Sequence, residues 1–95
     1  MSSKFKQVGI TKNNIPIYSG LFYIWETHGI PLDIVISILF SKNIMPSWVH
    51  LYDDFILNGT KPSSAISRIY EAICEAGDKN LADVVISRLK EMYKI

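Results

Sequence analysis

The chain is poor in cysteine and has no apolar run of membrane-spanning length. Its one cysteine, Cys74, cannot form a disulfide within the chain, which favours a reducing compartment. A membrane-spanning helix needs about 20 apolar residues, whereas the most apolar segment, residues 34–40, is interrupted by Ser37. The first residues lead into no apolar stretch of the kind found in secretory signals. We therefore expect a cytoplasmic protein with no membrane partner.

A large charge of either sign is also lacking. The chain has 10 Lys and Arg against 9 Asp and Glu, a formal net charge of +1. Attraction of the whole protein to nucleic acid or to a membrane surface needs a larger excess. The exception is local, because residues 1–18 carry Lys4, Lys6 and Lys12 and no acidic residue. These lysines are the expected phosphate contacts in an alternative interpretation, a nucleic-acid-binding regulator.

Motifs that support catalysis are lacking as well. The sequence has no glycine-rich phosphate loop, no serine at a strand–turn–helix elbow and no His-x-x-x-His pair. His50, Asp53 and Asp54 share a helical face, but a metal site needs three or four ligands, and a local His–Asp contact is the simpler interpretation. Two glutamates lie near Cys74, whereas a reactive thiolate needs cations. We assign no catalytic residue, cofactor or metal ligand; a metal or thiol enzyme is the third interpretation.

A near-repeat fifty residues apart is the clearest pattern present. Residues 32–39 read LDIVISIL and residues 82–89 read ADVVISRL, so five of eight positions are identical. Each copy follows a glycine, Gly29 or Gly77, that ends a stretch of apolar residues at helical spacing. Each copy therefore predicts the second helix of a helix–glycine–helix hairpin.

The positions of proline and small polar residues predict where five helices begin. Ser19 and Asn80 are expected N-cap residues. Pro31, Pro46 and Pro62 suit the first turn of a helix. The expected helices cover residues 19–28, 31–42, 46–57, 62–76 and 80–93.

The N-terminal segment has a different character from the rest. Residues 4–18 read as extended, and the Asn13-Asn14 pair can form a tight turn. We expect an all-α fold: a compact bundle of about five short helices built from two similar helical hairpins, with a short N-terminal extended arm or β-hairpin. The arm would be residues 1–18, and residues 19–95 would form a single helical domain.

Residues 25–41 also resemble a helix–turn–helix in layout, with Gly29 in the turn. A recognition helix must offer Arg, Lys, Asn or Gln to base edges, whereas residues 32–41 offer Asp33, Ser37 and Ser41 among isoleucines. The nucleic-acid alternative therefore rests on the basic N-terminal segment and not on these helices.

The chain has more apolar helical surface than one small core absorbs. The predicted core includes Leu32, Val35, Ile36, Leu39, Val85 and Leu89, and the core face expected for residues 80–93 also includes Leu81, Val84 and Met92. Four further apolar residues fall off that face and are the expected partner-binding residues: Tyr23, Trp25, Ile34 and Ile38. An apolar excess of this kind is typical of a protein interface or a self-association face. We therefore expect a small interaction or regulatory protein that binds another protein, alone or as a homodimer.

The amino-acid usage gives one indication of origin. Isoleucine outnumbers leucine and lysine outnumbers arginine, as AT-rich codons produce. This bias favours a phage or mobile-element protein.

Overall fold

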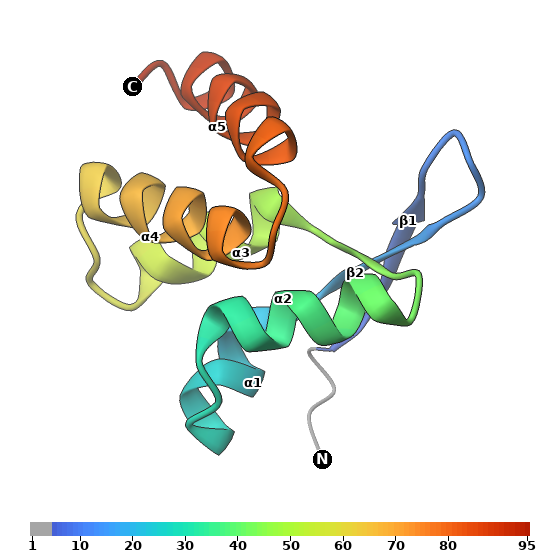
Figure 1. The fold of residues 1–95 in the computed structure, drawn as a ribbon. Coiled ribbons are helices and arrows are strands. Elements are labelled where there is room, and N and C mark those ends of the chain that lie inside the picture. The colour runs from blue at the N-terminus through green and yellow to red at the C-terminus, as the bar shows by residue number, and fades with distance from the viewer. Residues whose placement is uncertain (1–4) are drawn as a thin grey trace.

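The computed structural model describes residues 5–95, which form five helices and a three-stranded sheet (Figure 1). The strands are β1 (Lys6–Ile10), β2 (Pro16–Ser19) and β3 (Met45–Pro46). The helices are α1 (Leu21–His28), α2 (Leu32–Ser41), α3 (Trp48–Leu57), α4 (Pro62–Glu75) and α5 (Lys79–Tyr93). Figure 1 shows the β1–β2 hairpin projecting to one side of the helices.

The predicted all-α class is wrong, because the helices, which make up 63% of the described residues, are joined to a mixed sheet. Strands β1 and β2 pair antiparallel, and β2 pairs with β3 in parallel, in the order β1-β2-β3. Ile17 lies opposite Met45, and the Ser47 N–H donates to the Tyr18 carbonyl at 2.7 Å. The hairpin is therefore tied by backbone hydrogen bonds to the segment between α2 and α3.

The third strand was not predicted, because proline is compatible both with the start of a helix and with an extended segment. Proline suits the first turn of a helix, and residues 46–57 were expected to be helical. Proline also biases the residue before it toward extended geometry, and here Met45 and Pro46 form β3 while α3 begins at Trp48. Ser47, with φ −82° and ψ 101°, is the N-cap. A strand of two residues is too short to show a periodicity in sequence.

Two other helix starts differ from expectation. Ser19 is the last residue of β2, and Gly20, with φ 97°, precedes α1. At α5 the N-cap is Asp78 and not Asn80, because the Asp78 carboxylate accepts the Leu81 N–H at 3.0 Å. Aspartate and asparagine are comparable N-cap residues, so the sequence alone did not separate them.

Six residues of the predicted core are confirmed, since each is at most 9% exposed: Leu32, Val35, Ile36, Leu39, Val85 and Leu89. The prediction is wrong for Val84 and Met92 on α5, which are 50% and 60% exposed. Helix α4 packs against α2, α3 and α5 and so lies at the centre of the helical layer. Both copies of the near-repeat are helical, and the glycines before them have positive φ, 66° at Gly29 and 97° at Gly77.

Candidate binding cleft beside helix α5

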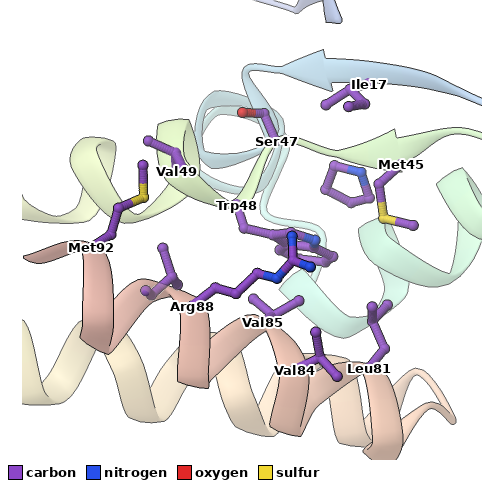
Figure 2. A pocket seen from close by; sticks show the side chains of 12 residues that line it. Ile17, Met45, Ser47, Trp48, Val49, Leu81, Val84, Val85, Arg88 and Met92 are labelled. Atoms are coloured by element: carbon purple, nitrogen blue, oxygen red, sulfur yellow. The ribbon is translucent and has the colours of Figure 1, made fainter. Parts of the chain in front are cut away.

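An apolar cleft of about 440 Å³ lies between α5 and the segment that runs from β3 into α3 (Figure 2). Six of its twelve lining residues come from α5, five from residues 45–49, and Ile17 from β2. Ten of the twelve are apolar, and the two polar ones are Ser47 and Arg88. Ligand sites of this volume commonly combine an apolar lining with a few polar groups.

Helix α5 forms one wall because its apolar residues occupy two adjacent rows. Val85 and Leu89, four residues apart, are 5% and 2% exposed and belong to the core. Val84 and Met92 lie in the next row and are 50% and 60% exposed. Residues three or four apart share a helical face, so a buried row forms the floor of the cleft and an exposed row forms its rim.

The opposite wall depends on the strand that the sequence did not predict. The parallel pairing of β2 with β3 places Ile17 beside Met45. The chain then turns into α3, where the half-buried Trp48 and Val49 complete this wall. Pro46 is among the fully buried residues. The cleft therefore forms only when the sheet joins the hairpin to the helices.

Ser47, at the edge of the cleft, contacts a histidine in the first turn of α3. Its Oγ lies 2.6 Å from His50 Nδ1. These are the N-cap and the third residue of α3, and Ser47 makes this side-chain contact without a capping hydrogen bond to the backbone.

Asp53, on α3, accepts a hydrogen bond from the C-terminal turn of α5. The Tyr93 hydroxyl donates a hydrogen bond to Asp53 Oδ1 at 2.7 Å, and the Tyr52 and Tyr93 ring centroids are 4.5 Å apart. Burial, together with the hydrogen bond to this carboxylate and its negative charge, raises the pKa of Tyr93 to about 12. These contacts fix the C-terminal turn of α5, which carries the rim residue Met92, against α3.

Arg88 is the one charged residue that lines the cleft. Within residues 5–95 it has no ion-pair partner, since the ion pair formed on α5 is that of Lys79 with Asp83 at 3.6 Å. Figure 2 shows its side chain extending from α5 over the cleft, on the side of Trp48. The cleft therefore combines an apolar surface with a single unpaired positive charge.

None of the four partner-binding residues predicted from the sequence lines this cleft. Tyr23 and Trp25 are half-buried against the core, and the Arg68 guanidinium lies 5.7 Å from the centroid of the Trp25 ring. Ile34 and Ile38 are each 44% exposed on the outer face of α2. The predicted set therefore consists of a packed pair and an exposed pair. The role of these four residues in binding stays a prediction.

The three lysines of the nucleic-acid alternative lie on the N-terminal segment. Lys4 is outside the described residues. Lys6 is exposed on β1, opposite Ser19, and Lys12 is exposed in the turn of the hairpin. Among residues 5–95 no three His, Cys, Asp or Glu side chains gather as metal ligands, and Cys74 is half-buried on α4.

The sequence prediction was wrong for the second row of α5, because it placed Val84 and Met92 on the core face, whereas they are 50% and 60% exposed. Val84, Arg88 and Met92 follow one another at four-residue spacing, one position away from the core residues. Two apolar residues on a face that the core does not use indicate a covered or binding surface. The opposite wall could not be recognised in the same way, because Met45 and Trp48 are about forty residues away in sequence.

No protein-family model, curated protein or solved structure matches this chain. Among the helices of residues 5–95, none has the length and apolar character needed to cross a membrane. Function is therefore inferred from the chemistry of the cleft.

Proposed function

We propose that the chain is a small interaction module, not an enzyme, that binds a protein partner through the apolar cleft beside α5. The observation that carries this proposal is the exposure of Val84 and Met92, 50% and 60%, at the rim of a hollow with an apolar floor. Removing apolar surface from water contributes about 25 cal/mol per Å², and a partner that covers the rim would gain this free energy.

The other lining residues suit protein recognition. Trp48 is of the type most often found among residues that dominate binding energy. Met45 and Met92 are flexible and polarisable, and methionine-rich surfaces adapt to helical or irregular partners. The half-buried Trp48 between two methionines would therefore provide an anchor with adaptable edges.

Binding is favoured over catalysis by the polar groups of the cleft. Ser47 lies against His50, but neither His50 nor any carboxylate lines the cleft. A serine–histidine nucleophile usually has a third group that orients the base. The other polar lining residue, Arg88, offers only N–H donors and no acceptor, which suits binding of an acceptor group. We also propose a cytoplasmic location, because the single cysteine cannot form a disulfide within the chain.

A matched pair of variants tests the site. Val84→Asp changes the rim of the cleft, and Ile34→Asp changes the equivalent, similarly exposed position of the near-repeat on α2. Tagged wild type and both variants are used to capture proteins from the native host, with far-UV circular dichroism as the folding control. We expect a partner that is captured by the wild type and by Ile34→Asp but not by Val84→Asp.

The reverse pattern contradicts the proposal. A partner lost with Ile34→Asp and kept with Val84→Asp would place the interface on α2, with Ile34 and Ile38. Binding to DNA that weakens steeply between low and moderate salt, and that disappears when Lys6 and Lys12 are neutralised, would support the nucleic-acid alternative instead.

A further inference from the structure

The unpaired charge in the cleft limits the chemistry of its occupant, on the assumption that the proposed function holds. Arg68 and Lys79 have partners, namely the Trp25 ring and Asp83. Arg88 has no such partner within residues 5–95, and the cleft contains no carboxylate. A partner that covers Arg88 removes water from a guanidinium, and this is costly unless the partner supplies an acceptor. A carboxylate is the natural acceptor, because it can bind a guanidinium through two parallel hydrogen bonds.

The shape of the α5 wall limits the secondary structure of the occupant. Leu81, Val85, Arg88 and Met92 follow the alternating spacing of four and three residues that forms a seam between packed helices. The eleven steps from Leu81 to Met92, at a rise of 1.5 Å each, give this seam a length of about 16 Å. A helix of about three turns lying along α5 would match it, in the helix-in-groove mode of recognition.

An extended peptide fits this site less well. Adding a strand to a sheet needs an edge with free N–H and carbonyl groups. The strand in the cleft wall, β3, has only two residues, and one of them is Pro46, which lacks an N–H. The outer strand β1 contributes no residue to the cleft lining. It carries Lys6 and has an irregular register between Gln7 and Gly9, and both features discourage edge pairing.

We infer that the cleft binds an amphipathic α-helix of the partner, of about three turns, with an Asp or Glu that meets Arg88. Its apolar residues, spaced three and four apart, would cover Val84 and Met92 and contact Trp48. The acidic residue would lie within the apolar stripe or directly beside it, because Arg88 lies between these rim residues on α5.

A charge-swap experiment on the full chain tests this inference. The probes are helical 16-residue peptides from a display library, with leucines fixed at positions spaced three and four apart and the other positions random, selected on immobilised wild type. We expect the selected peptides to share an acidic residue at one position. Changing that residue to Lys should weaken binding to the wild type at least about tenfold. The Arg88→Glu variant should bind the Lys peptide better than the original peptide.

Two controls show whether the peptides occupy the cleft. Lys90→Glu removes an exposed cation from α5 that does not line the cleft, and it should change affinity less than about threefold at 0.15 M salt. Val84→Asp should abolish binding of every selected peptide. Because Val84 and Arg88 are both exposed, these variants should fold, and circular dichroism verifies this.

The possible outcomes separate this inference from the proposed function. Selected peptides without a shared acid, or with no response to the charge swap, overturn the acidic helix. If the host partner is still lost with Val84→Asp, the binding function stands. Selected peptides that bind Val84→Asp and Arg88→Glu as well as they bind wild type also overturn the inference. A dimer in solution that Val84→Asp dissociates would make a second copy of the chain the occupant and would equally overturn it.

Discussion

Segment 32–39 of α2 and segment 82–89 of α5 share five identical residues and turn the same positions inward. Residues 32, 35 and 39 of the first copy and 82, 85 and 89 of the second are all buried. Their outward positions also correspond, since Ile34 and Val84 are 44% and 50% exposed. Local sequence thus determines which face of each helix joins the core, wherever in the fold that helix lies.

The two copies differ in what lies beside the outward face. On α5 this face adjoins β3 and the start of α3, and together they enclose the cleft. On α2, Ile34 and Ile38 are exposed and line no part of that cleft. The more apolar outer face belongs to α2, yet the binding surface that we propose is on α5. A hollow needs two walls, so hydrophobicity of one helix is an incomplete guide to a site.

The substitutions with the largest expected effect on stability test whether the two copies contribute equally to the core. Leu39 and Leu89 are 5% and 2% exposed at matching positions. Truncating either residue to alanine should lower the free energy of unfolding by about 2–5 kcal/mol. Urea denaturation followed by circular dichroism measures this. A loss below about 1 kcal/mol at one position alone would show that the two copies contribute unequally despite similar burial.

This comparison also shows what sequence reasoning can reach. Helical periodicity correctly predicted the core positions on α2 and the core residues Val85 and Leu89 on α5, because each pattern is local to one helix. It wrongly included Val84 and Met92, since periodicity does not show how wide a face the core covers. It also correctly placed Ile34 and Ile38 outside the core. It missed β3, since the pairing of Met45 with Ile17 joins residues that are distant in sequence. The cleft was missed for the same reason, because its walls come from segments about forty residues apart.

The next effect concerns binding and distinguishes the two outer faces. Val84→Asp should weaken the host-partner complex by about 2 kcal/mol or more, since an ionised carboxylate would replace apolar contact at the rim. Ile34→Asp should leave affinity unchanged within about 0.5 kcal/mol. Isothermal titration calorimetry with the purified partner measures both values. Equal losses from the two variants would mean that the partner contacts α2 as well as α5.

A smaller effect tests how α5 is held against α3. Tyr93→Phe removes the hydrogen bond to Asp53 and should lower the free energy of unfolding by about 1 kcal/mol near neutral pH. The pKa of Tyr93 is raised from 10.0 to about 12 in the folded protein, so the folded state favours the protonated hydroxyl. This contribution is present below pH 10 and is lost as the pH rises toward 12.

The difference in stability between wild type and Tyr93→Phe should therefore narrow between pH 10 and pH 12. Urea denaturation at each pH gives this difference, and subtraction cancels the titration of the other groups. Tyr18→Phe is the control, because within residues 5–95 the Tyr18 hydroxyl has no carboxylate partner. A constant difference across this pH range would show that the Tyr93–Asp53 contact does not stabilise the folded state.

The smallest expected effect on stability comes from exchanging the outward residues at which the copies differ most. Ile38→Arg on α2 and Arg88→Ile on α5 each change an exposed side chain, so each should alter the free energy of unfolding by less than about 0.5 kcal/mol. Their effects on binding should nevertheless differ. Arg88→Ile should abolish the preference for an acidic over a lysine-substituted peptide, whereas Ile38→Arg should preserve it. Fluorescence anisotropy with the two peptides measures this preference. If Ile38→Arg changed it as strongly as Arg88→Ile, both outer faces would act in recognition, and the site would extend from α5 to α2.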